Sequence, residues 1–197
     1  MISRFENNKS KKDSIDLWRK FKTLYKEELS KKTSDIFKKL IDFYHEPSQR
    51  TEFNDEIISK LAASLDYKVR KEFLQIDFSL YITPSSGWPV PLVFIEHEND
   101  HEEPNELSKL CSTYALLKVF IAWHNGNWEN DRSGIIEDDW TYQTSSYLEV
   151  YKNLDGILGI IVASYNQGKK LLTYYVESLD EIKKEFVNEG ILFQVQL

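Results

Sequence analysis

An apolar run that ends in acids decides the fold of this chain: Leu92-Val93-Phe94-Ile95-Glu96-His97-Glu98. Side chains alternate between the two faces of a β-strand, so Glu96 and Glu98 share one face and lie about 7 Å apart, at two strand rises. A carboxylate in an apolar strand is costly to bury unless a cation or a hydrogen-bond donor compensates it. The run therefore predicts a buried strand whose acidic end could hold a divalent metal ion.

A second strand with an internal acid precedes this run: Ile76-Asp77-Phe78-Ser79-Leu80. Alternation places the three apolar residues on one face and Asp77 on the other. Residues 84–89, Pro-Ser-Ser-Gly-Trp-Pro, are rich in turn formers and are short enough to close a hairpin between the two strands. Paired strands lie about 4.8 Å apart, which would bring Asp77 within bridging distance of Glu96.

The chain before this hairpin reads as helices followed by one strand. Apolar residues at spacings of three and four predict helices over about residues 13–29, 34–43 and 54–65. Alternation then predicts a strand over residues 68–82, in which the parity of the apolar positions changes between Phe73 and Leu74. Because no Gly, Pro or Asn is present there, we expect a bulge in one long strand rather than a turn.

The chain after the hairpin reads as a crossover and a closing hairpin. A helical stripe from Leu107 to Ala115, with Pro104 in its first turn, is followed by a buried-type strand over 117–123. These spacings predict that the strands 92–98 and 117–123 run parallel. A hairpin over 156–165 and 171–177, a short helix over 179–188 and a strand over 191–195 complete the prediction.

The predicted fold class is α/β in the α+β sense, with a central mixed β-sheet flanked by helices. We expect one domain over residues 1–197. Residues 1–66 form its mainly helical N-terminal part, and residues 67–123 form an αβββαβ core together with the preceding helix. Residues 124–197 supply an aromatic loop, a C-terminal β-hairpin and the last helix and strand.

Composition limits the class of protein. Hydrophobic content of 41% and aromatic content of 14% argue against a disordered chain. The single cysteine, Cys111, excludes an internal disulfide and a multi-thiolate zinc site. No apolar stretch reaches membrane-spanning length, and the N-terminus lacks the hydrophobic segment of a signal peptide. We therefore expect no membrane contact and a cytoplasmic location.

Charge is distributed unevenly along the chain. Residues 1–40 carry 12 Lys and Arg against 6 Asp and Glu, whereas residues 41–197 carry 13 against 26. A basic N-terminal arm could contact nucleic-acid phosphates, or its lysines could simply face water on a solvated helix. The pI near 5.2 argues against strong, indiscriminate DNA binding.

At Asp77, at Phe94-Ile95-Glu96-His97-Glu98 and in the helix and strand that follow to Trp123, the chain resembles the PD-(D/E)XK nuclease superfamily, which has the restriction-endonuclease-like fold. The resemblance covers about residues 68–123. It implies that Asp77 and Glu96 bind Mg²⁺ or Mn²⁺, with the main-chain carbonyl of His97 as a further ligand. The chain departs from the motif at Glu98, where the family usually has lysine, and at Ile76, where the motif's name has proline.

This resemblance implies hydrolysis of phosphodiester bonds in nucleic acid, DNA in preference to RNA. The catalytic residues would be Asp77, Glu96 and Glu98, and Glu98 could accept the proton of the attacking water or hold a second metal ion. Two-fold cutting of a duplex would require a homodimer. The missing lysine leaves an alternative, which is a catalytically inactive binding or regulatory protein on the same scaffold.

Other charged residues near the motif are expected to stay outside the site. Lys109 falls nearly opposite the apolar stripe of its helix and is expected to face solvent. Arg70 and Lys71 lie on the strand before the predicted bulge, and either could bend toward the site. Glu56 and Glu72 could be accessory acids, but a surface salt bridge is the preferred interpretation for both.

Three further patterns have a functional and a structural interpretation. The run His97-Glu98-Asn99-Asp100-His101 matches the His-Glu-x-x-His motif of zinc proteases, but that chemistry requires a helix and the run continues a strand. His97 could be a base, although alternation turns it away from the glutamates and favours a structural histidine. The aromatic stretch over 123–142 could stack on bases or cover the site, but anchoring of a loop by these side chains is preferred.

Overall fold

The computed structural model describes residues 4–42, 47–98, 104–151 and 154–197. The helices are α1 (Arg4–Ser30), α2 (Ser34–Asp42), α3 (Pro47–Ser64), α4 (Pro104–Cys111), α5 (Trp128–Ile135), the π-helix η1 (Ile136–Thr141) and α6 (Tyr142–Tyr151). The strands are β1 (Lys68–Phe73), β2 (Ile76–Ile82), β3 (Val90–Glu98), β4 (Leu117–Asn125), β5 (Ile157–Asn166), β6 (Leu171–Asp180) and β7 (Glu185–Gln196).

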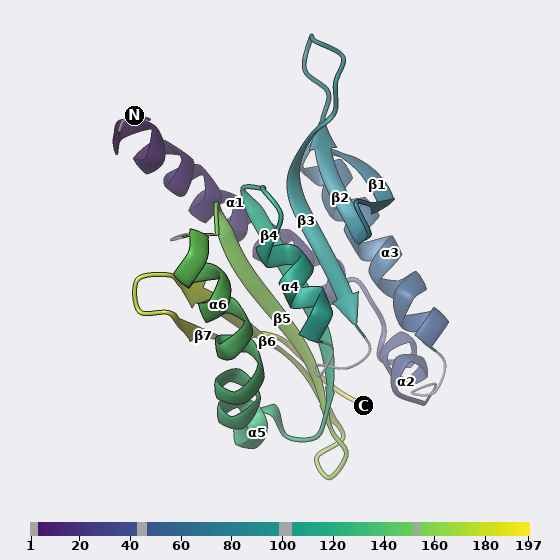
Figure 1. Ribbon diagram of the computed structural model, residues 1–197. Coiled ribbons are helices and arrows are strands. Elements are labelled where there is room, and N and C mark those ends of the chain that lie inside the picture. The colour runs from purple at the N-terminus through teal and green to yellow at the C-terminus, as the bar shows by residue number, and fades with distance from the viewer. Residues whose placement is uncertain (1–3, 43–46, 99–103, 152–153) are drawn as a thin grey trace.

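One seven-stranded sheet joins the strands in the order of the chain, from β1 to β7. The pairs β3/β4 and β4/β5 are parallel and the other neighbours are antiparallel. The predicted mixed sheet, the hairpin between β2 and β3 and the parallel crossover through α4 are therefore confirmed. A second crossover, through α5, η1 and α6, carries the chain from β4 to β5 (Figure 1).

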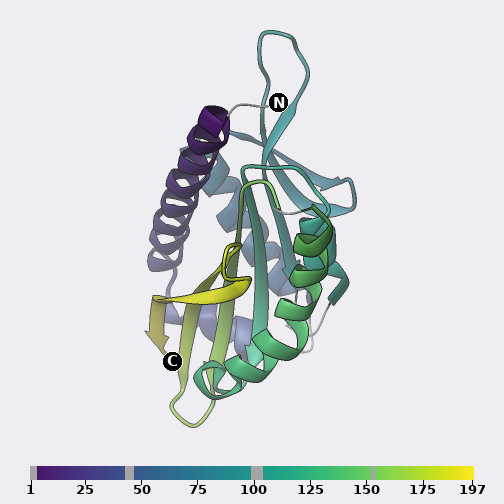
Figure 2. The same cartoon turned by 60° about the vertical axis from the view of Figure 1, so that its left-hand side comes forward.

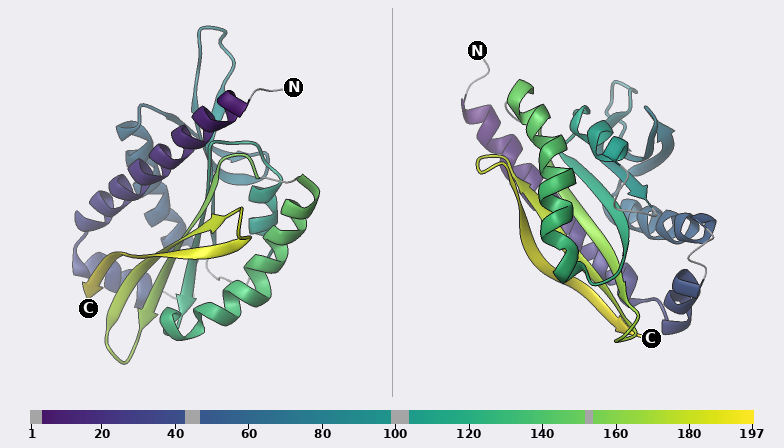
Figure 3. Two further views of the ribbon diagram at one scale, coloured as in Figure 1. Left: turned by 90° about the vertical axis from the view of Figure 1, so that its left-hand side faces the viewer. Right: turned by 60° about the horizontal axis from the view of Figure 1, so that its bottom comes forward.

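Helices cover both faces of this sheet. Helices α1, α2 and α3 lie on one face, and α4, α5, η1 and α6 lie on the other (Figures 2 and 3). Each interface has its own apolar core. Helices α1 and α3 pack on one set of alternate residues along β2 to β6, while α4 to α6 pack on the other set, along β3 to β6. The alternation of side chains along buried strands thus supplies two cores from one sheet.

Helix α1 follows the predicted apolar stripe but begins at Arg4, earlier than residue 13. Its residues Trp18, Phe21 and Tyr25 are buried against the sheet. A Cβ atom on Gly159 of β5 would lie 2.6 Å from the Trp18 ring, so the close approach of α1 to the sheet requires glycine there. In the described residues, no helix combines the length and the apolar character needed to span a membrane.

Helices α2 and α3 also differ from their predicted bounds. Helix α2 ends at Asp42, so the predicted end at residue 43 lies outside the described residues. Helix α3 begins at Pro47, seven residues before the predicted start, because proline is well suited to the first turn of a helix.

The predicted bulge between Phe73 and Leu74 is wrong, because two strands meet there in a tight hairpin. Phe73 pairs with Ile76, and the two residues between them, Leu74 and Gln75, have φ angles of +58° and +64°. Two left-handed residues in a two-residue loop match the twist of the flanking strands, although Asn and Gly usually occupy these positions. The turn also overturns the predicted facing of β2, since Ile76 packs with the α4 core and Phe78 with the α3 core.

The predicted helix over 179–188 is also wrong. Strand β6 continues to Asp180 and β7 begins at Glu185, with Leu179 opposite Phe186. The Asp180 carboxylate accepts hydrogen bonds from the N–H groups of Ile182 and Lys183, which closes the turn. Helical spacing of apolar residues there was misleading because Ile182 is exposed while the long β6/β7 pairing satisfies the backbone.

From Trp128 onward the aromatic stretch over 123–142 is helical rather than an irregular loop, which corrects the prediction for the start of segment 124–197. The indole rings of Trp128 and Trp140 are fully buried, with ring centroids 5.4 Å apart. Arg132 of α5 forms a bidentate pair with the buried carboxylate of Glu177 on β6, at 2.5 and 2.7 Å. The anchoring role of the aromatic side chains is confirmed, and these two rings are not available to stack on bases.

Replacing Leu74-Gln75 by Asn-Gly should stabilise the protein. Each non-glycine residue in the left-handed region costs on the order of 1 kcal/mol, and Asn-Gly adopts this turn with little strain. We expect the free energy of unfolding, measured by urea denaturation, to rise by about 1 kcal/mol. A fall in the urea midpoint would show that the wild-type side chains contribute contacts that outweigh the strain.

Candidate functional site

The pairing of β2 with β3 ends at Phe78 and Ile95, and the two predicted acids lie one residue beyond. Glu96 Oε2 accepts a hydrogen bond from the main-chain N–H of Asp77 at 3.2 Å. Asp77 Oδ2 in turn accepts one from the main-chain N–H of His97 at 3.0 Å. Two carboxylates from adjoining strands are thus brought together by reciprocal hydrogen bonds.

Burial disfavours charge on both carboxyl groups. Glu96 is fully buried, and its Oε1 atom has no hydrogen-bond partner in the described part of the chain. Burial, reinforced by the nearby charge of Asp77, raises the pKa of Glu96 to about 9. Burial also raises the pKa of Asp77, against the opposing effect of the His97 N–H and of Glu96. Without a metal ion, Glu96 is therefore protonated at neutral pH.

Lys109 of α4 reaches this pair, so the prediction that it faces solvent is wrong. Its Nζ lies 3.7 Å from Glu96 Oε1 and forms an ion pair with Glu106 one turn earlier. Burial lowers the pKa of Lys109, but the hydrogen bond to Glu106 and the charge of Glu96 more than offset this effect and raise it. The helical angle predicts on which side of α4 the Cα atom of Lys109 lies. It does not predict the course of the four-carbon side chain, which can turn back toward the sheet.

Glu98 and His97 line a neighbouring cleft of about 430 Å³. Asp77 also lines this cleft, between β1, β2, β3 and helix α3. Burial, assisted by the charge of Arg50, lowers the pKa of His97 to about 4, so its imidazole is neutral at pH 7. His97 Nδ1 lies 3.8 Å from Asp77 Oδ2, too far for a hydrogen bond.

Most of the remaining charged residues of the predicted neighbourhood have local partners. Lys71 forms an ion pair with Asp55 of α3, and the guanidinium of Arg70 lies 4.6 Å from the centroid of the Phe73 ring. Glu56 bonds to Lys32 and Lys60, which confirms its interpretation as a surface salt bridge. Glu72 has a left-handed φ of +52° and lines the cleft beside Asp77.

The donor set fits a hard divalent cation in character. Mg²⁺ is usually bound through one or two carboxylates and retains several waters, and Asp77 and Glu96 supply two carboxylates with one oxygen that lacks a donor. Across the ranges that the structure describes, no group of three or more His, Cys, Asp and Glu side chains is arranged to hold a metal ion. Any further ligands would come from main-chain carbonyls, water or substrate.

The zinc-protease interpretation of His97-Glu98-Asn99-Asp100-His101 is not supported. His97 and Glu98 belong to β3, so no single helix can contain all five residues, and residues 99–101 lie outside the described ranges. Only a helix would direct both histidines toward one metal ion.

Comparison with protein-family models, with curated proteins and with solved structures gives no match for this chain.

The metal-free protein should lose stability as the pH rises through the range set by Glu96. The unfolded chain releases this proton near pH 4.5, whereas the folded chain retains it to about pH 9, so the free energy of unfolding falls between these values. Glu96→Gln should remove most of this slope and stabilise the metal-free protein near neutral pH by on the order of 2 kcal/mol. Urea denaturation in EDTA across the pH range measures both effects.

Glu56→Gln is the matched control for this experiment. Glu56 is exposed, and its pKa is lowered by its lysine partners rather than raised. Its replacement should leave the pH slope of the wild type in place. A Glu96→Gln variant with an unchanged slope would show that Glu96 is ionised in the folded protein.

Proposed function

We propose that this protein is a Mg²⁺-dependent nuclease that hydrolyses phosphodiester bonds in nucleic acid, with DNA as the preferred class. The observation that supports this proposal is the pair of buried carboxylates, Asp77 and Glu96, contributed by adjoining strands and approached by a lysine. The resemblance to the PD-(D/E)XK nuclease superfamily around these residues points in the same direction.

Asp77 and Glu96 would hold the metal ion, together with the main-chain carbonyl of His97. A bound Mg²⁺ supplies activation of water and stabilisation of negative charge on a phosphate. Glu98 is half-buried at the end of β3 and lines the cleft. From this position it would accept a proton from the attacking water. The neutral imidazole of His97 adds no positive charge, and its ring packs on the α3 side of the sheet as a structural residue.

Lys109 would supply the positive charge that the motif lacks at Glu98. Its ammonium group lies within 3.7 Å of Glu96, and Glu106 holds it there from the same face of α4. An ammonium in this place can bind a phosphate oxygen through charge-assisted hydrogen bonds and stabilise the charge that develops on it. A lysine from the crossover helix thus takes the place of a lysine from the strand.

A binding or regulatory protein without catalysis is the second candidate. The reciprocal hydrogen bonds of Asp77 and Glu96 satisfy two main-chain N–H groups, so the pair has a structural role even when no metal ion is bound. Titration calorimetry with Mn²⁺ separates the candidates, since a nuclease of the proposed kind must bind the ion and a structural pair need not.

Glu96→Ala and Asp77→Asn should each reduce metal-dependent cleavage of DNA to background. Each variant removes one of the two carboxylates that would hold the ion, and the affinity for Mg²⁺ should fall with the activity. Cleavage of plasmid and single-stranded DNA in Mg²⁺ or Mn²⁺ measures the effect, with Glu56→Gln as the control variant. Activity that persists in both variants would rule out these residues as the metal site.

Lys109→Met should lower the cleavage rate by roughly a hundredfold while leaving the affinity for Mn²⁺ unchanged or increased. The substitution preserves the length of the side chain and removes a positive charge that competes with the cation for Glu96. Lys60→Met, at an exposed lysine of α3, is the matched control. Equal rates for Lys109→Met and the wild type would contradict a role for this ammonium group.

A further inference from the structure

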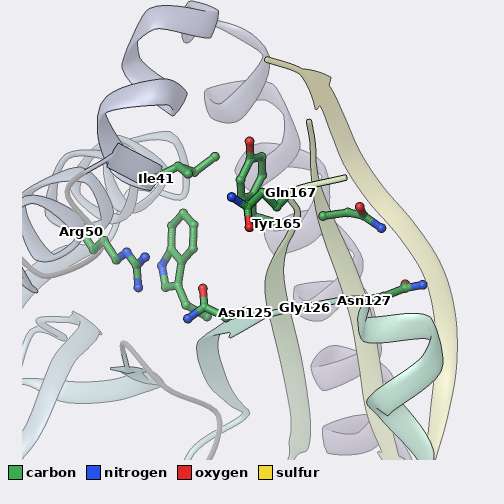
Figure 4. A pocket seen from close by; sticks show the side chains of 9 residues that line it. Ile41, Arg50, Asn125, Gly126, Asn127, Tyr165 and Gln167 are labelled. Carbon is green, nitrogen blue, oxygen red and sulfur yellow. The ribbon is translucent and has the colours of Figure 1, made fainter. Parts of the chain in front are cut away.

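A second and larger pocket opens at the carboxyl ends of the parallel strands β4 and β5. Its volume is about 710 Å³, and helices α2 and α3 form its opposite wall. The side chains that define its chemistry are shown in Figure 4: Arg50, Trp123, Asn125, Asn127, Tyr165 and Gln167. Pockets at the carboxyl ends of parallel strands are common ligand sites in open α/β sheets, because loops there converge from several strands.

Arg50 gives this pocket a fixed positive charge. The guanidinium carbon lies 4.2 Å from the centroid of the Trp123 ring, and Nε donates a hydrogen bond to the main-chain carbonyl of Leu40 at 3.5 Å. The residue is 2% exposed, so its side chain is held in place by packing as well as by these contacts. Among the lining residues that the structure describes, Arg50 alone carries a charge, and this favours an anionic ligand.

Amide side chains and the ring of Tyr165 form much of the rest of the wall. Asn125, Asn127 and Gln167 offer both donors and acceptors, which can match the hydrogen-bonding edge of a base. The half-buried ring of Tyr165 lies across the pocket from Arg50 (Figure 4). A cation, planar amides and an aromatic face are the combination by which proteins bind unstacked nucleotides.

The pocket adjoins the acidic cleft that Asp77, His97 and Glu98 line. His97 pairs with Ile121 of β4, so Trp123 lies two residues farther along the same face of the sheet. Arg50 and Thr51 are consecutive on α3, and they line the second pocket and the acidic cleft respectively. The charge of Arg50 also acts on His97, the residue next to Glu96. A strand that places a phosphate beside Asp77 in the acidic cleft can therefore place a neighbouring nucleotide in the pocket.

We propose that this pocket binds one unpaired nucleotide, with its phosphate toward Arg50 and its base between Tyr165 and the amide side chains. A base within a continuous duplex is stacked on both faces and paired on one edge, so it cannot enter a pocket of this kind. The substrate is then single-stranded nucleic acid or an unpaired end. Nucleotide binding in this pocket does not depend on catalysis, whereas the identification of the pocket as a substrate site rests on the proposed nuclease function.

Asn125→Asp tests the pocket with a minimal change of shape. Asn125 is exposed at the pocket rim, so the substitution introduces a negative charge without disturbing the core. We expect it to weaken the binding of a short 3′-fluorescein oligothymidylate about tenfold, measured by fluorescence anisotropy in EDTA. Asn130→Asp, at an exposed position of α5, is the control of equal charge and should bind as the wild type does.

A second variant, Tyr165→Leu, removes the aromatic face while keeping apolar bulk. It should weaken oligothymidylate binding about fivefold or more, the range for loss of stacking on one base. A blunt duplex of matched length should bind more weakly than the single strand to the wild type. Equal binding by Asn125→Asp and Asn130→Asp, no binding by the wild type, or equal affinity for the blunt duplex would each overturn the proposal.

Cleavage assays on the same variants separate the two proposals. Binding that is sensitive to Asn125→Asp, in a protein that cleaves nothing with Mg²⁺ or Mn²⁺, would support the pocket and reject the nuclease. Cleavage that depends on Glu96, with wild-type affinity for oligothymidylate in Asn125→Asp, would support the nuclease and reject the pocket.

Discussion

Where β2 and β3 cease to pair, each strand presents a main-chain N–H group that the ladder no longer satisfies, and a carboxylate from the other strand accepts it. This exchange lets two acids enter the sheet between buried apolar residues. It does so at the cost of charge, because burial and the nearby charge of Asp77 raise the pKa of Glu96 to about 9 when no metal ion is bound. The same arrangement therefore forms without a metal ion. Because it brings two carboxylates together, it would also bind such an ion more readily than a single hydrogen-bonded acid.

Helix α3 connects this junction with the rest of the molecule. Its apolar side packs on β2 to β6 through residues such as Ile57 and Leu61, which fixes the helix against the sheet. Near the start of this helix, two successive residues line different pockets. Arg50 lies over Trp123 in the second pocket, and Thr51 lines the acidic cleft. The opposite face is closed by α4, which brings Lys109 to Glu96. Groups from both helical layers thus converge on one end of strands β2, β3 and β4.

The sequence predicts the strands that carry the acids, their hairpin and the parallel crossover, because buried strands and amphipathic helices have strong periodicity. The prediction fails where a local sequence preference is outweighed by another interaction. Leu74 and Gln75 adopt a turn without turn formers, and β7 replaces a predicted helix because strand pairing satisfies more backbone. The meeting of Asp77 with Glu96 follows from pairing register, whereas the position of Lys109 depends on a side-chain conformation that periodicity does not encode.

The order of strands in the sheet, from β1 to β7 without interruption, has a consequence for the growth of the chain. Every strand finds its partner in the segment just before or just after it, so short loops close first and each new strand extends an existing edge. A nascent chain that has passed β4 already contains both acids, the lysine and the two arms of their junction. The later hairpins can then be added at the edge formed by β4, so that synthesis and folding can proceed in the same direction.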